Sequence, residues 1–348
     1  MSTTQVFAEL AYWQQTGIRV GAALAAVLLV AGALVYMHLF KAVSFMQSRL
    51  GPMEAGPYGS LQLLAEVGKH IQKEDIFPAK ADRFVFGAAP FVVLASTFLL
   101  VVVVPAGPDA WFIDHHNSDL GIYLGLAVSS VSVLGILMAG WGSSNKYSLL
   151  GGLRATGQLI AYELPLILAV VGVVIQAGTM NMADIVYAQA NGEIFGLGIV
   201  GNPYILTQGV AFIIFLIAMQ AELAQAPFDM PVAESELVTG YMTEYSGMRF
   251  LLFFIGEFAT AGVFAAVASV LFLGGWYIPG IDPGADVMNL LGPLVMLVKI
   301  VGLTFLVFWT RFTMPRFRED QLQRLAWKFL IPIALANIVV TGILKVAF

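Results

Sequence analysis

The feature that most constrains this chain is a series of long apolar runs that few charged residues interrupt. Each run approaches or exceeds the roughly twenty residues that an α-helix needs to cross a bilayer. The eight runs lie near residues 20–45, 84–104, 121–140, 155–175, 203–220, 250–273, 288–309 and 327–346. Of the 348 residues, 59% are hydrophobic and only 11% are charged, a composition that soluble domains do not have. We therefore predict an all-α integral membrane protein with about eight transmembrane helices in a single membrane domain, residues 1–348.

The lysines and arginines between these runs orient the predicted helices. They fall in the first, third, fifth and seventh loops, whereas the second, fourth and sixth loops have none. Cytoplasmic loops accumulate Lys and Arg, so the odd-numbered loops are predicted to be cytoplasmic and both termini to lie on the other side. The N-terminal segment carries Glu9 and no basic region. A cleaved signal peptide is therefore not expected.

Composition also excludes several classes of function. The net charge of -5 argues against a nucleic-acid partner, because such binding depends on basic surfaces. The chain has no cysteine, which excludes disulfides, Cys-ligated iron–sulfur clusters and thiolate zinc sites. Its histidines are His38, His70, His115 and His116, and none is expected at mid-span. We expect no metal and no flavin bound by this chain alone.

The first loop is longer than a simple connection and contains a second kind of helix. Residues 60–73 have an amphipathic pattern, with Gln62, Glu66, Lys69 and Lys73 on one face and apolar residues on the other. Such a helix is typical of one that lies in the membrane interface. Packing against a partner protein would explain the same periodicity.

The fifth loop is unusually acidic. Between residues 221 and 249, Arg249 is the only basic residue. The same stretch has five carboxylates, which are Glu222, Asp229, Glu234, Glu236 and Glu244. Clustered acids with few cations are expected to raise one another's pKa, which suits groups that pass protons. Taken singly, each could equally be a solvated surface acid, and Phe228 and Met230 would supply an apolar wall beside them.

Three ionisable residues lie within the predicted spans. Glu163 is in the fourth span, Glu257 in the sixth and Lys299 in the seventh. An ionisable residue in a membrane usually faces a partner or a water-filled path. We therefore favour a proton-relay role for Glu163 and Glu257, and a structural ion pair with Lys299 is the alternative.

Several long motifs resemble a known family. The fifth loop reads APFDMP at 226–231, AESELV at 233–238 and TEYSGM at 243–248, and further blocks read GPYG at 56–59 and NKYSLLG at 145–151. Together they closely resemble the signature of the H subunit of NADH-quinone oxidoreductase, respiratory complex I, the family of mitochondrial NADH dehydrogenase subunit 1. The resemblance covers nearly the whole chain.

This resemblance implies a function and a setting. The family's protein lies in the bacterial cytoplasmic (inner) membrane and joins the electron-carrying peripheral arm to antiporter-like subunits, with lipid around it. It holds no redox centre, is active only within the complex and lines the chamber where quinone, ubiquinone or menaquinone, is reduced. Matching positions for the proton path are Glu163, Glu222, Glu234, Glu236, Glu244 and Glu257. Matching positions for the quinone passage are Gln62, Ala65, Phe228, Asp229 and Met230.

The sequence also departs from the family pattern. Charges that the family usually shows are replaced at Leu39, Phe40, Glu54, Gln225 and Val232, and Ser130 stands where some members carry an acid. These changes keep open a homologous membrane subunit of a membrane-bound hydrogenase-type complex, although the retained AESEL and EYSG blocks favour complex I. A stand-alone secondary transporter is a third possibility. It is disfavoured because no duplicated halves are visible.

Overall fold

The computed structural model describes residues 12–108, 119–192 and 201–347, which form helices and connecting segments without a β-strand. The helices of the first half are α2 (Tyr12–Leu34), the π-helical η1 (Val35–Ala42), α3 (Val43–Met46), η2 (Pro57–Gly59), α4 (Gln62–Gln72), α5 (Arg83–Val103), α6 (Gly121–Gly142) and α7 (Lys146–Ala177). Those of the second half are α8 (Met182–Asn191), α9 (Tyr204–Thr207), α10 (Gly209–Glu222), α11 (Glu234–Leu237), η4 (Gly240–Met242), α12 (Gly247–Phe272), α13 (Asp286–Thr313), α14 (Glu319–Leu325), η5 (Ala326–Leu330) and α15 (Ile331–Ala347). An all-α membrane protein is confirmed.

Seven helices within the described part of the chain are long and apolar enough to cross a membrane. Two of them are composite, since α2, η1 and α3 form one continuous helix and α14, η5 and α15 form another. These two composites, together with α5, α6, α7, α12 and α13, correspond to all the predicted spans except the fifth, although α7 and the composites are longer than predicted. The count of eight stays a prediction because the remaining apolar helix, α10, is short.

The predicted fifth span is broken in two. Gln208 separates α9 from α10, and its buried side chain donates to Thr341 (2.8 Å) and accepts from Asn337 (2.8 Å) on α15. The 14 residues of α10 would extend only about 21 Å at 1.5 Å per residue. The helix nevertheless runs antiparallel to α7. Near one end of α7 the side chain of Gln176 donates to Thr207 (2.8 Å), and near the other Gln158 donates to the carbonyl of Ala221 (2.7 Å).

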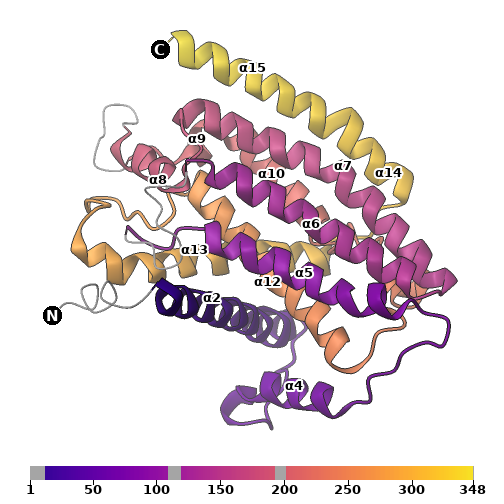
Figure 1. Ribbon diagram of the computed structural model, residues 1–348. Coiled ribbons are helices and arrows are strands. Elements are labelled where there is room, and N and C mark those ends of the chain that lie inside the picture. Colours follow the sequence, from indigo (N-terminus) through magenta and orange to yellow (C-terminus); the bar gives the residue numbers. More distant parts are fainter. Residues whose placement is uncertain (1–11, 109–118, 193–200, 348) are drawn as a thin grey trace.

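The long helices pack side by side. Figure 1 shows α15 along one edge of the bundle and α2 along the opposite edge, with α7, α6 and α5 between them. Small residues allow the closest approach: a Cβ on Gly140 of α6 would lie 2.9 Å from the Cα of Gly152 on α7. In a membrane, where neighbouring lipid is as apolar as the helices, such close backbone packing is a main source of helix association.

Polar caps define where two of the spans begin. The carboxylate of Asp82 accepts from the backbone N–H groups of Phe84 (3.0 Å) and Val85 (3.2 Å) at the start of α5. Asn145 accepts from the N–H of Tyr147 (2.9 Å) at the start of α7. Each cap satisfies donors that a helix leaves free in its first turn. The chain therefore leaves the loops at fixed points.

Helix α4 confirms the helix predicted in the first loop, and its position at a membrane interface stays a prediction. It lies outside the bundle of long helices (Figure 1). The side chain of Leu63 approaches Gly32 on α2, where an added Cβ would come within 2.9 Å of it. After α4, Asp75 forms an ion pair with Arg249 at the start of α12 (2.8 Å). This contact fixes the first loop to the fifth.

The four loops predicted to be cytoplasmic meet at one end of the bundle, which we call the loop end. It comprises residues 47–82, 143–145, 223–246 and 314–318. Hydrogen bonds connect these segments: the N–H of Asp82 donates to Gly142 (3.1 Å), and the N–H of Phe317 donates to Pro227 (3.0 Å). The alternation of helices that the basic residues predicted is therefore reproduced in the loops, and the side of the membrane stays a prediction.

Candidate functional site

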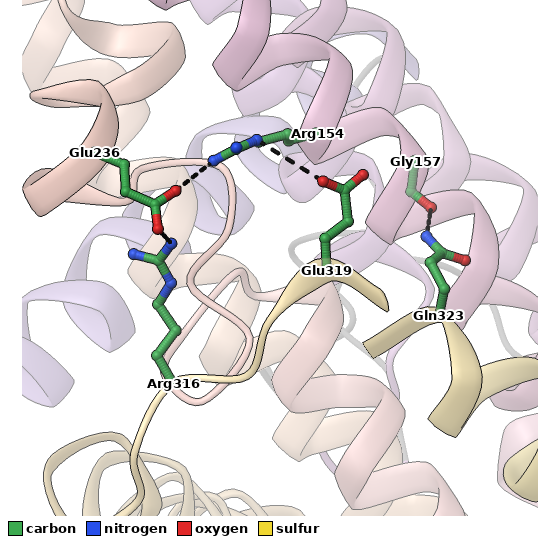
Figure 2. Close-up of polar contacts among 6 residues, drawn as sticks. All are labelled: Arg154, Gly157, Glu236, Arg316, Glu319 and Gln323. Carbon is green, nitrogen blue, oxygen red and sulfur yellow. Dashed lines mark hydrogen bonds and ion pairs between the residues drawn. The ribbon is translucent and has the colours of Figure 1, made fainter. Parts of the chain in front are cut away.

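Glu236 is held at the loop end by two arginines from distant parts of the chain. Its Oε2 lies 2.8 Å from Nη1 of Arg154 on α7, and its Oε1 lies 2.6 Å from Nη2 of Arg316 in the segment after α13 (Figure 2). Arg154 also approaches Glu319 at 4.0 Å. In the same view, Gln323 of α14 donates to the carbonyl of Gly157 on α7 (3.0 Å). These contacts join α7, the fifth loop and the segment leading to α14.

The arginines also determine the charge state of Glu236. The hydrogen bond from Arg154 and the nearby charge of Arg316 lower the pKa of this carboxyl below its ordinary value. The sequence predicted mutual repulsion and a raised pKa, because Arg249 was the only basic residue in that stretch. For Glu236 this prediction is wrong, since cations from two other segments neutralise it.

The other two acids of the predicted loop cluster have different environments. Glu244 accepts a hydrogen bond from the side-chain amide of Asn145, which also caps α7. Glu234 is exposed at the start of α11. Among the described residues it has neither an ion pair nor a side-chain hydrogen bond. The structure therefore does not bring Glu234, Glu236 and Glu244 into one group of interacting carboxylates.

Glu257 lies near the loop end of α12 with one neutral and one charged neighbour. The amide of Gln225 donates to it, and Nη1 of Arg311 on α13 lies 4.0 Å away. Gln225 is only 5% exposed. The position where the family usually has an arginine therefore provides a neutral hydrogen-bond donor here, and Arg311 is the cation nearest this carboxylate.

Asp229 belongs to the same neighbourhood and is close enough to Glu257 for their charges to interact. Burial raises the pKa of Asp229, and the nearby charges of Arg311 and Arg316 oppose that shift. Burial likewise raises the pKa of Tyr241, with Glu257 and Asp229 acting in the same direction. This group of acids and one tyrosine lies where the fifth loop meets α12 and α13.

Glu222 and Glu163 form a second pair, between α10 and α7. The two side chains are close enough to interact electrostatically. Glu163 accepts a hydrogen bond from Ser130 on α6. In the described part of the chain, the Oε2 atom of Glu222 is buried without a hydrogen-bond partner. Both acids thus have neutral surroundings, in contrast to Glu236.

Lys299 is bound by backbone carbonyls. Its ammonium donates to the carbonyl oxygens of Leu273 (2.8 Å), Gly275 (2.6 Å) and Tyr277 (3.2 Å) in the segment after α12. Among the ion pairs of the described residues, none joins Lys299 to Glu163 or Glu257. The residue therefore ties α13 to the turn that follows α12.

The residues predicted for the quinone passage do not line one common cavity. Phe228 and Met230 are 3% and 4% exposed, and Phe228 packs edge-on against Tyr162 with ring centroids 5.2 Å apart. Gln62 on α4 donates to Glu66 one turn later (3.2 Å), and Ala65 is exposed. The cavity that Phe228 lines includes neither Gln62 nor Ala65.

The fifth loop has a strained backbone around these residues. Ala224, Ala233 and Val238 have φ values of 50°, 36° and 66°, a region that costs a non-glycine residue about 1–3 kcal/mol. Gly240 has a φ of 57°, and a Cβ there would lie 1.8 Å from the carbonyl oxygen of Pro231. Strain of this kind concentrates at functional sites.

Sequence reasoning missed His38. It lies in the π-helical segment η1 and is 2% exposed. Its ring nitrogens lie 3.2 Å from the carbonyl oxygens of Leu34 and Val301, and its ring stacks on Phe308 with centroids 5.2 Å apart. The only signal in the sequence was a histidine inside an apolar run.

The fold and site define a class of protein: an all-α membrane protein in which buried acids connect a loop-side polar cluster to a transmembrane helix. Comparison with known proteins gives the family. The model of the NADH dehydrogenase family matches residues 19–342. The chain belongs to this family, and the resemblance to the H subunit of NADH-quinone oxidoreductase is confirmed.

Its relatives cover almost the whole chain. In Syntrophobacter fumaroxidans, the second of the H subunits of NADH-quinone oxidoreductase is 45% identical over 326 residues, which are 92% of each chain. The H subunit of NADH-quinone oxidoreductase from Brevibacillus brevis is 44% identical over 325 residues, again 92% of each chain. The protein of the same name from Bacillus thuringiensis subsp. konkukian is 42% identical over 309 residues, 88% of this chain and 87% of its own.

Proposed function

We propose that this chain is the membrane subunit of a proton-pumping NADH-quinone oxidoreductase that lines the quinone chamber and couples quinone reduction to proton translocation through buried carboxylates. The observation that carries the proposal is the placement of four acids. Asp229 and Glu257 lie at the loop end, and Glu222 and Glu163 interact between α10 and α7. Acids buried in membrane helices are typical of proton pathways.

In this proposal the neutral partners matter as much as the acids. Ser130 and Gln225 donate to Glu163 and Glu257 without adding a charge. A carboxylate fixed by an arginine holds its negative charge, whereas one with a neutral donor can exchange a proton without breaking an ion pair. Glu236, bound by two arginines, would then serve to hold the loops. Glu234 and Glu244 would provide acidic groups at the loop surface of the path.

The quinone would approach from the loop end, beside the peripheral arm. Gln62, Ala65 and Asp229 would border its passage, and the packed side chains of Phe228 and Met230 would support the wall from behind. Reduction to quinol takes two electrons and two protons. Partner subunits would supply the electrons, and this chain would supply walls and proton-binding groups in the cytoplasmic membrane.

Purification from the native membrane in mild detergent tests this function. We expect the chain to copurify with flavin, iron–sulfur and antiporter-like subunits, and the complex to reduce quinone in an inhibitor-sensitive manner with NADH as donor. A nickel–iron hydrogenase component without quinone reduction would favour the hydrogenase-type alternative. Recovery of a solitary, active chain would contradict both.

A further inference from the structure

An apolar cavity that none of the acids lines lies on the outside of the bundle. It has a volume of about 440 Å³ and is bounded by α10, the fifth loop, the end of α13 and α14. Residues at its margin are exposed: Leu306 is 37% exposed, Met314 55% and Phe317 36%. Because α13 is a membrane-spanning candidate, an opening on this side faces the membrane near the loop end.

The lining has no polar group left to recognise a polar ligand. Its only polar side chains are Gln220 and Thr310. Gln220 donates to the carbonyls of Ala226 (2.7 Å) and Val307 (3.3 Å). Thr310 bonds to carbonyls of its own helix, including that of Val307 (2.9 Å). The cavity therefore suits a hydrocarbon chain.

Cations gather at the loop side of the cavity. Arg324 precedes the lining residue Leu325, and Lys328 lies one turn further along the same helix. Both are exposed, and among the described residues neither has an ion pair or a side-chain hydrogen bond. Arg316 and Arg318, by contrast, are neutralised by Glu236 and by Asp320.

From this arrangement we propose that the cavity binds one acyl chain of an anionic phospholipid, whose phosphate is held by Arg324 and Lys328. Basic residues beside a groove between membrane helices are a recurrent way to bind anionic lipid head groups. Trp327, between the two cations, is 54% exposed, and tryptophan is enriched at the level of lipid head groups. The acids of the proposed proton path do not contribute to the lining.

The two other plausible occupants fit less well. A quinone ring needs hydrogen-bond donors for its two carbonyl oxygens, and the lining offers none that is free. A transmembrane helix of a partner would cover the apolar margin but would place little negative charge beside Arg324 and Lys328. A lipid satisfies the apolar cavity and both cations together.

Photo-crosslinking of the intact complex tests the site. The probes are phosphatidylglycerol and phosphatidylcholine that carry the same diazirine-labelled acyl chain, and labelled peptides are located by mass spectrometry. We expect the anionic probe to label residues 306–317 and 216–227 preferentially. The double variant Arg324→Gln/Lys328→Gln should reduce this preference by about fivefold for each cation removed, since each contributes about 1 kcal/mol near a lipid surface.

Matched variants separate the site from general lipid contact. Arg83→Gln removes an exposed cation elsewhere at the loop end, and Val298→Trp enlarges a side chain on α13 that is 72% exposed; both should leave the labelling unchanged. Leu216→Trp should fill the cavity and reduce it. Equal labelling by the two lipids, an unchanged preference in the double variant, competition by an isoprenoid quinone, or crosslinks to a partner protein at these peptides would each overturn the proposal.

Discussion

Glu236 and the pair Glu222–Glu163 are the same residue type in opposite settings. Glu236 lies on the surface, with a side chain 49% exposed and two arginines at 2.8 and 2.6 Å. Glu222 has a buried oxygen without a partner, and Glu163 accepts from a serine. The charged partners fix Glu236 in its ionised form and connect three segments. The neutral partners leave the two acids between the helices free of any such ion pair.

The difference teaches that an acid's partner, more than its place in a motif, determines its role. Glu222, Glu234 and Glu236 lie within a short stretch, yet the structure gives them a buried, a solvated and an ion-paired environment. Ion pairs at a protein surface usually contribute little. Glu236 is an exception because it joins segments far apart in the sequence.

The largest effect is expected at Glu222. The variant Glu222→Gln preserves the size of the side chain and removes its ability to exchange a proton. If this acid carries protons, proton pumping by the reconstituted complex should fall by about tenfold or more, within the range of rate effects of proton-transfer groups. The measurement is quinone-dependent acidification of proteoliposomes. Pumping at the normal rate, in fully assembled complex, would remove the distinction between Glu222 and Glu236.

A smaller but still large effect is expected from Lys299→Met. Three carbonyls would lose their donor, at a cost of about 2–4 kcal/mol for buried acceptors left unsatisfied. We expect less assembled complex in the membrane, measured by native gel electrophoresis. Because Lys299 contacts carbonyls and no acid of the path, the double variant with Glu163→Gln should be additive in thermal stability. Strong coupling would identify Lys299 as the counter-ion of the buried acids.

Glu236→Gln should lower the melting temperature of the complex by a few degrees at neutral pH. Since Arg154 and Arg316 lower the pKa of Glu236, the ion pairs stabilise the folded protein at pH values above the ordinary glutamate pKa of about 4.3. That stabilisation is lost as the pH falls through the lowered pKa. The difference between variant and wild type should therefore be constant from neutral pH down to mildly acidic pH. A difference that disappears above the ordinary pKa would show that the pairs do not hold the loops.

The smallest effect is expected from Ser130→Ala. Loss of the hydrogen bond to Glu163 should cost about 0.5–1.5 kcal/mol and slow coupled quinone reduction only a few-fold, because the carboxyl itself remains. Ser132→Ala is the matched control, since that hydroxyl donates to Ser129 on its own helix (2.8 Å). Identical rates in both variants would show that Ser130 does not position Glu163.

The sequence predicted most of the fold and the residue types of the site, and tertiary contacts supplied the rest. Apolar runs and basic loops located the helices and loops, and the amphipathic pattern located α4. The break at Gln208 depends on hydrogen bonds to α15, which no local pattern reveals. The charge state of Glu236 depends on arginines 82 and 80 residues away along the chain. The carbonyls that hold Lys299 converge only after the turn between α12 and α13 has formed.

The most direct test of the central claim is the number of protons pumped per electron in proteoliposomes that contain the Glu163→Gln complex. The control is Glu74→Gln, which removes an exposed acid in the first loop. If buried acids with neutral partners carry the protons, the ratio should fall sharply for Glu163→Gln and stay at the wild-type value for Glu74→Gln. An unchanged ratio and turnover in the Glu163→Gln complex would contradict the proposed coupling role.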